Sequence, residues 1–221
     1  MRATMFNKLY DRFFKDYPTD EELIKEATSI PPTLPDAQPL INKIVLWKLN
    51  RIIGLDDGNL QNLFELVQKR KDKQNLCKKE KELIDKLLEV SGLGLPMLST
   101  ILHVLNPERF PIIDVRANRE LQFWKYCEEN KEIYCEQLMS WNDNPELHEK
   151  QLKKRASSSS DNFTYKDIKS TAEYYADYIE KCHTYNKKLD IKDFKQVDKI
   201  LYVSDKWVRG RKINERKNKR K

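Results

Sequence analysis

The chain has 221 residues, of which 39% are hydrophobic and 35% charged, so it is long enough to bury a core and too apolar to be disordered throughout. Its formal charge is +7, but residues 206–221 hold nine basic residues and one acid, which leaves residues 1–205 at about −1. No apolar run reaches the length of a membrane span, and the N-terminus lacks the apolar core of a secretory signal.

Four cysteines, separated by 50, 8 and 47 residues, lack the spacing of metal ligands. We therefore expect no metal, no iron–sulfur cluster and no cofactor. The thiols of a cytoplasmic protein stay reduced, and a cytoplasmic location, at the nucleoid if the chain is bacterial, fits the composition. These expectations exclude secreted proteins, membrane-spanning proteins and small proteins cross-linked by disulfides.

Apolar residues recur mostly at spacings of three and four, and glycine is scarce, which predicts an all-α fold. In chain order we expect two short helices over 6–27, a proline-rich connection and a mostly buried helix over 40–51. A turn at 56–58 precedes an amphipathic helix that begins at Leu60. The lysine-rich run 69–81 is interpreted as the solvated continuation of that helix and the loop after it.

The most informative stretch is 81–121, where two apolar-faced helices flank a short turn that contains Gly92 and Gly94. Pro96 falls in the first turn of the second helix, where its missing amide proton costs nothing. A third helix is predicted to begin close to Asp114. After it come a polar insertion over about 126–162, a helix over 164–186, a last helix over 190–207 and a basic, disordered tail over 206–221.

The turn at Gly92, Leu93, Gly94 and Leu95 presents backbone N–H groups at a helix N-terminus, where they can bind an anion such as a phosphate. Glycine lets the anion approach without a side chain in the way. The alternative is a tight turn that only joins two packed helices. On these residues alone both interpretations stay open.

An apolar run, Phe110 to Ile113, directly precedes Asp114, so this acid is expected in a partly dry place at a helix N-terminus. The helix dipole favours its ionised form there. Such a carboxylate can stabilise an oxocarbenium-like centre and position a water molecule at a glycosidic carbon. The alternative is a structural N-cap that contributes about 1 kcal/mol.

The segment Leu88 to Leu121 resembles the core of the helix-hairpin-helix DNA glycosylase superfamily, in which a Gly-x-Gly hairpin between two helices is followed by an aspartate that opens the next helix. Gly92, Gly94 and Asp114 match this pattern in kind, order and spacing. The segments 44–51 and 193–201 resemble, more loosely, flanking parts of uncharacterised bacterial and phage-related proteins with the same hairpin. The resemblance implies one globular unit of two helical lobes over 1–205.

Bifunctional members of the superfamily carry a lysine two residues after the second hairpin glycine, where this chain has Pro96. Proline cannot form the Schiff base that cuts the DNA backbone. The resemblance therefore implies a monofunctional DNA glycosylase without AP-lyase activity, although another lysine such as Lys48 could replace the missing one. The four-cysteine cluster of endonuclease III relatives is also missing from the sequence.

The implied mechanism is base flipping by a monomer on double-stranded DNA that contains a damaged or modified base. Asp114 is the catalytic candidate, and the hairpin with Arg116 and Arg119 supplies the DNA contacts. For these arginines, and for Arg109 nearby, ion pairs are the alternative. The flipped base needs an aromatic or apolar stacking surface, and the candidates are Trp47, Trp124, Phe123 and Trp141. For each of them, packing in the core or in the insertion is the alternative. Lys48 is a further candidate for the base pocket. His103 is expected to be a structural histidine with a hydrogen-bonded ring and no catalytic role.

Two rival functions remain. One is a non-catalytic helix-hairpin-helix DNA-binding module in which Asp114 only caps a helix. The other is a nuclease or lyase that uses a different residue. The sequence leaves open which base is excised and whether the setting is genome repair or defence against modified foreign DNA.

Overall fold

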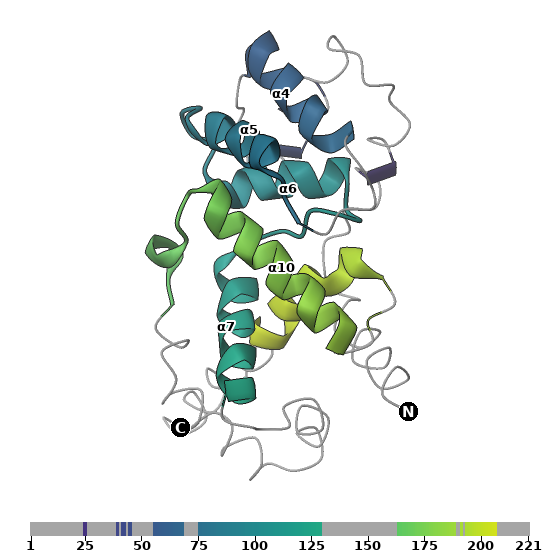
Figure 1. Cartoon of the computed structure of the whole chain (residues 1–221), viewed down its shortest axis with the longest axis vertical. Coiled ribbons are helices and arrows are strands. Elements are labelled where there is room, and N and C mark those ends of the chain that lie inside the picture. The colour runs from purple at the N-terminus through teal and green to yellow at the C-terminus, as the bar shows by residue number, and fades with distance from the viewer. Residues whose placement is uncertain are drawn as a thin grey trace, which may run out of the picture.

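A computed structural model describes residues 24–25, 39, 41–42, 44–45, 55–68, 75–129, 163–188, 191 and 193–206 of the chain (Figure 1). Every regular element in these ranges is helical, which confirms the all-α prediction for this part. The elements are α4 (Asp57–Gln68), α5 (Lys78–Leu88), α6 (Leu95–Leu105), α7 (Val115–Glu129), α10 (Ala172–Lys188), the 3-10 turns η2 (Tyr165–Asp167) and η3 (Phe194–Gln196), and a helix over 197–206.

Two sequence predictions near the start of this region are corrected. The predicted turn at 56–58 is the beginning of α4, because the Asp56 carboxylate accepts the N–H of Asn59 at 2.7 Å and so caps the helix. Residues 78–81, predicted as solvated continuation and loop, form the first turn of α5. The Glu80 carboxylate accepts the N–H of Cys77 at 2.8 Å, and this bond fixes where α5 begins.

The predicted hairpin is confirmed as a connection between α5 and α6. Gly92 has a φ of 83°, a left-handed conformation that glycine adopts without a Cβ penalty. Gly94 is the N-cap of α6, and Pro96 lies in its first turn as expected. Between the two glycines, the Leu93 side chain is buried and anchors the turn to the core.

The predicted start of the third helix is also confirmed, since α7 begins at Val115 with Asp114 before it. The helix predicted over 164–186 begins later, at Ala172. Thr164 and Asp167 close the separate short turn η2, and Ile168 is extended, with φ −79° and ψ 104°, so the two helical pieces are not continuous. Asp85 of α5 then accepts the N–H of Ala172 at 2.7 Å and ties the start of α10 to α5.

One apolar core connects the helices. Figure 1 shows α4, α5 and α6 gathered at one end and α7 at the other, with α10 running from beside α5 past α7. Buried side chains from these helices and from the helix over 197–206 belong to a single cluster, among them Leu63, Leu87, Ile101, Phe123, Tyr175 and Leu201. Within the described ranges, no helix combines the length and apolarity needed to cross a bilayer.

Several predictions fall on residues outside the described ranges. They are the helices over most of 6–27, nearly all of the insertion over 126–162, and the tail beyond Lys206. The pocket candidates Trp47 and Lys48, together with Trp141, also lie there. The division into a domain over 1–205 and a tail over 206–221 stays a prediction.

Candidate functional site

The hairpin exposes its glycines and buries its leucines. Leu93 and Leu95 are 1% and 0% exposed, so their side chains belong to the core, whereas Gly92 and Gly94 are exposed. Gly94 has φ −72° and ψ 164°, which any residue adopts, and a Cβ placed there would meet only the Pro96 ring at an ordinary 3.9 Å. In the part of the chain that the structure describes, nothing around Gly94 requires a glycine, so the position is open to a group from outside.

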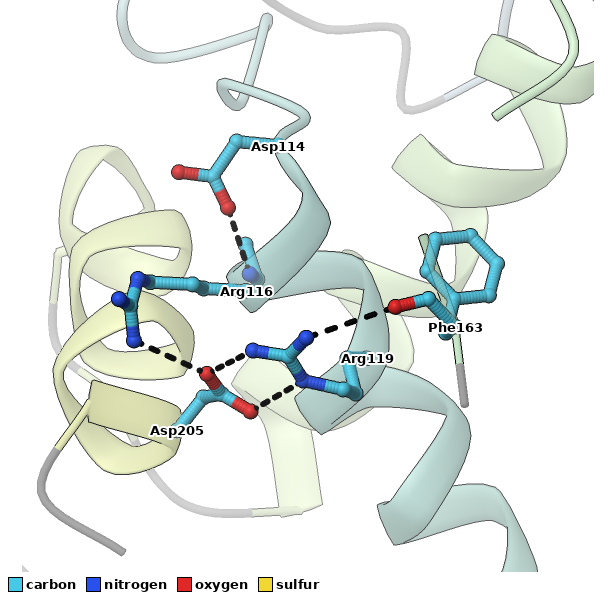
Figure 2. A network of polar contacts seen from close by, with 6 residues as sticks. Asp114, Arg116, Arg119, Phe163 and Asp205 are labelled. Carbon is cyan, nitrogen blue, oxygen red and sulfur yellow. Dashed lines mark hydrogen bonds and ion pairs between the residues drawn. The ribbon is translucent and has the colours of Figure 1, made fainter. Parts of the chain in front are cut away.

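Asp114 is half-buried at the start of α7. One of its carboxylate oxygens accepts the N–H of Ala117 at 2.7 Å, and its carbonyl accepts the N–H of Asn118 at 3.0 Å, so it is the N-cap of the helix. Figure 2 shows the other carboxylate oxygen pointing away from α7. The residue therefore has the structural role that the sequence left open, and it also presents an oxygen away from the helix.

The segment that leads to Asp114 is held by buried polar side chains. The hydroxyl of Tyr175 donates to the Pro111 carbonyl, and that of Tyr178 donates to the Ile112 carbonyl, both at 2.9 Å. Burial raises the pKa of both tyrosines well above 10, so both stay protonated as donors. The backbone before Asp114 is thereby fixed to α10.

Helix α6 holds the same segment from its other side. Ring nitrogen Nδ1 of His103 lies 2.8 Å from the Phe110 carbonyl, and His103 is fully buried, in agreement with the structural role expected for it. Ser99 accepts the N–H of Ile113 at 3.1 Å and donates to the Pro96 carbonyl at 3.0 Å. Through Ser99, the first turn of α6 at the hairpin is bonded to the residue before Asp114.

Arg116 and Arg119 project from α7 onto Asp205 of the C-terminal helix (Figure 2). Nε of Arg119 donates to Asp205 at 2.6 Å, a second bond joins Nη2 to the other carboxylate oxygen, and Nη1 donates to the Phe163 carbonyl at 3.4 Å. Only 9% of the Arg119 side chain is exposed. Arg119 thus forms the ion pair that was the alternative for this residue, and its predicted DNA contact stays a prediction.

Arg116 is less enclosed. Its Nη1 lies 3.4 Å from Asp205, its guanidinium lies 5.5 Å from the centre of the Tyr202 ring, and 38% of its side chain is exposed. Its predicted DNA contact stays a prediction. Arg109, in contrast, forms a buried two-bond ion pair with Glu80, with both distances 2.9 Å.

The structure places the aromatic candidate Trp124 in the core. It is 3% exposed, its indole N–H donates to Glu120 at 3.0 Å, and Tyr185 packs edge-on with ring centres 4.8 Å apart. Phe123 is completely buried as well. Neither ring has a surface on which a base could stack, so the pocket role predicted for Trp124 is replaced by its alternative of core packing.

Sequence reasoning missed Tyr165 as a candidate, because it treated this residue as part of a long helix. Tyr165 lies in η2 and is 61% exposed. Partial burial and then the negative charge of Asp114 raise the pKa of its hydroxyl above the usual value of 10. The pairing of Thr164 with Asp167 three residues later was the available signal that a separate turn begins here.

No family model matches the chain, and no curated protein or solved structure matches it either. Among the described residues, no group of three or more histidine, cysteine, aspartate or glutamate side chains could hold a metal ion. The candidate site consists of an exposed glycine at one helix N-terminus and a carboxylate at a second helix N-terminus. Ser99 bonds the two elements that carry them.

Proposed function

We propose that this chain is a monofunctional DNA glycosylase that hydrolyses the bond between a damaged or modified base and deoxyribose. The observation that carries the proposal is the position of Asp114 at the start of α7, on a backbone segment that Ser99 joins to the Gly94 hairpin. A DNA glycosylase has to hold a phosphate and a glycosidic carbon at a fixed separation. The bonds through Ser99 give this chain such a connection between its two candidate contact points.

In the proposed reaction the exposed hairpin binds the DNA backbone at Gly94, the N-terminus of α6, and one nucleotide is extruded from the duplex. The N-glycosidic bond breaks, and the base leaves with the bonding electron pair and takes up a proton. The Asp114 carboxylate stabilises the positive charge that develops on the sugar. Water then adds to the sugar carbon and loses a proton, which leaves an abasic site.

The enzyme is proposed to be monofunctional because Pro96 occupies the position where bifunctional helix-hairpin-helix DNA glycosylases, which this segment resembles, have a lysine. The Pro96 ring is part of the first turn of α6, and its carbonyl accepts hydrogen bonds from Ser99 and Thr100 at 3.0 and 2.8 Å. This position has only a structural use. DNA strands are therefore expected to break after alkali treatment and not before it.

One observation favours a second function, a non-catalytic DNA-binding module. An oxygen of Asp114 is already engaged with the N–H of Ala117 at 2.7 Å, as in any helix cap. Under this function Asp114 stabilises α7 and takes no part in a reaction. The hairpin would bind DNA in the same way under both functions, so binding alone does not separate them.

The test is a panel of duplexes, each with one altered base, assayed for free base and for strand breaks before and after alkali. Asp114→Asn keeps a preferred N-cap and removes the charge, whereas Asp114→Ala removes both. We expect Asp114→Asn to lower base release by about 100-fold or more while the melting temperature and DNA affinity stay near wild type. Asp114→Ala should also lose about 1 kcal/mol of stability.

Asp56 provides a matched control, because it caps α4 with the same 2.7 Å bond to the residue three positions on. Asp56→Asn and Asp56→Ala should change stability as the Asp114 variants do and leave base release unchanged. Release of no base by the wild type from any duplex, with DNA binding intact, would favour the binding module. Equal base release by wild type and Asp114→Asn would show that another residue is catalytic.

A further inference from the structure

Tyr165 is the exposed large hydrophobic side chain of the described part of the chain. A single exposed tyrosine is ordinary by itself, but its ring can stack on a flat ring when it lies beside a binding site. The segment that carries the ring is bonded to the helix that begins after Asp114, the proposed catalytic acid, because Arg119 of α7 donates to the carbonyl of Phe163, two residues before Tyr165. An aromatic surface is therefore available at the site where the buried Trp124 and Phe123 offer none.

The turn that carries Tyr165 is fixed on both sides. Before the ring, the Phe163 carbonyl accepts a bond from Arg119, which lies just over one helical turn beyond Asp114 (Figure 2). Within the turn, the backbone N–H and the hydroxyl of Thr164 donate to Asp167 at 2.6 and 2.8 Å. After the ring, the Ile168 side chain is buried in the core. Tyr165 is thus presented to solvent by an ordered support.

Two lysines follow Tyr165 closely in the sequence. Lys166 and Lys169 are exposed, and no ion pair engages either of them among the residues that the structure describes. The one acid of the turn, Asp167, is committed to bonds with Thr164. Exposed aromatic rings together with nearby lysines are the combination with which proteins bind unpaired nucleotides, because the ring stacks on the base and the cations neutralise phosphates.

We propose that residues 164–169, the Tyr165 turn, form a second DNA-contacting element in which the Tyr165 ring stacks on the extruded base and Lys166 and Lys169 bind the adjacent phosphates. This inference rests on the proposed function, since it places the base next to Asp114. It assigns the stacking surface to a residue whose ring is already exposed before DNA binds. No rearrangement of the core is needed to form the contact.

The test compares two duplexes of one length. The first is fully paired, and the second has a 2-aminopurine opposite a tetrahydrofuran abasic analogue, so that the fluorescent base has no partner and is easily extruded. Tyr165→Ala should reduce the preference for the second duplex by about tenfold, whereas Tyr165→Phe keeps the ring and should retain that preference. At saturating protein, 2-aminopurine should be quenched in the wild-type and Tyr165→Phe complexes and brighter with Tyr165→Ala.

The lysines are tested through salt. Lys166→Gln and Lys169→Gln should each reduce the slope of log affinity against log salt concentration by about 0.9, equally on both duplexes, because each removes one phosphate contact. Lys78→Gln is the control, since this side chain is 93% exposed at the far end of α5 from the hairpin. It removes the same charge and should leave the slope unchanged.

The outcomes separate this inference from the proposed function. If wild type binds neither duplex, both fail. If wild type prefers the extrudable base and releases a base in the panel, but Tyr165→Ala behaves like wild type, the inference is overturned and the glycosylase proposal stands. Loss of preference in Tyr165→Phe to the same extent as in Tyr165→Ala would mean that the hydroxyl acts and the ring does not stack. That result would also overturn it.

Discussion

Two of the buried carboxylates among the described residues, Glu80 and Asp205, are each paired with guanidinium groups. Taking a charge out of water is costly, and a buried pair offsets that cost only when its geometry is good. Arg109 meets this condition with two parallel bonds of 2.9 Å to Glu80. Burial raises the pKa of Glu80, but the bonds from Arg109 and from the Cys77 N–H outweigh it, so the net pKa lies below the usual value.

Removal of Arg109 should therefore be far more damaging than removal of a surface lysine. Arg109→Met leaves Glu80 buried without its partner and should lower the free energy of unfolding by about 3–5 kcal/mol, measured by urea denaturation at neutral pH. Lys79→Met is the control, because Lys79 forms a 2.6 Å pair with Glu65 at a site that is 62% exposed on the lysine side. It should cost less than about 1 kcal/mol.

The same pair predicts the direction of the pH response. Because the folded-state pKa of Glu80 is depressed, its contribution is complete above the unfolded value of 4.5 and is lost as the pH falls through the folded value. Glu80→Gln should flatten the decline in melting temperature below about pH 4.5. An acid limb as steep in Glu80→Gln as in wild type would contradict this assignment.

The two glycines of the hairpin between α5 and α6 have different structural roles. Gly92 needs its left-handed φ of 83°, whereas Gly94 is an ordinary N-cap with room for a Cβ. Replacement of Gly92 by Ala should cost about 1–2 kcal/mol of stability whatever the protein binds. Replacement of Gly94 should affect only what approaches it from outside.

Gly94→Ser and Gly94→Asp isolate that external contact, because Ser and Asp are preferred N-caps and should preserve or raise the melting temperature. Under the DNA-binding functions, Gly94→Ser should weaken duplex affinity, and Gly94→Asp should weaken it further because its charge repels a phosphate. Gln61→Glu, an exposed change on α4, alters the net charge by the same amount and is the control for Gly94→Asp. Unchanged affinity in Gly94→Asp would mean that the turn only joins two helices.

Elements with strong local signals were predicted well. Glycine and proline at 92–96 and an acid after an apolar run at 114 gave the hairpin and the start of α7, because turn and cap chemistry is encoded within a few residues. The start of α10 was predicted eight residues early, since Tyr165 and Ile168 continue a helical spacing that the Thr164–Asp167 turn interrupts. The spacing of apolar residues alone does not distinguish one continuous helix from a short turn followed by a later helix.

The site was harder to predict because its contacts join distant parts of the chain. Arg119 pairs with Asp205, which lies 86 residues away, and no local pattern indicates that partner. Trp124 was open to both a pocket and a core role, because aromatic residues on an apolar helix face have the same spacing in either case. The four bonds that hold 110–113 come from α6 and α10, so only the tertiary structure shows how Asp114 is positioned.

For the whole molecule, the positive charge is concentrated at the C-terminal end. Residues 206–221 hold nine of the basic residues and one acid, and the remainder of the chain is close to neutral. Nonspecific DNA affinity depends mainly on the release of counterions from phosphates. Under the proposed function, the tail should therefore supply much of the salt-dependent DNA affinity and none of the selectivity between duplexes.

A variant that ends at Trp207 lacks eight basic residues and one acid. Its slope of log affinity against log salt concentration should be at least about 1 unit shallower than that of wild type, because phosphate contacts are lost. The ratio of affinities for the extrudable-base and fully paired duplexes should not change. Filter binding at four salt concentrations measures both quantities, and an identical slope would exclude the tail from the complex.

Asp205 also defines how far the chain can be shortened from this end. Its carboxylate is fully buried and forms the ion pair with Arg119 of α7. Asp205 nevertheless lies only one residue before the last described position, Lys206. Trimming that stops after Lys206 spares this partner. Removal of two further residues, Lys206 and Asp205, would leave the buried guanidinium of Arg119 on α7 without its carboxylate partner. Tolerance of C-terminal digestion should thus change abruptly within two residues, at the point where the basic tail gives way to the fold.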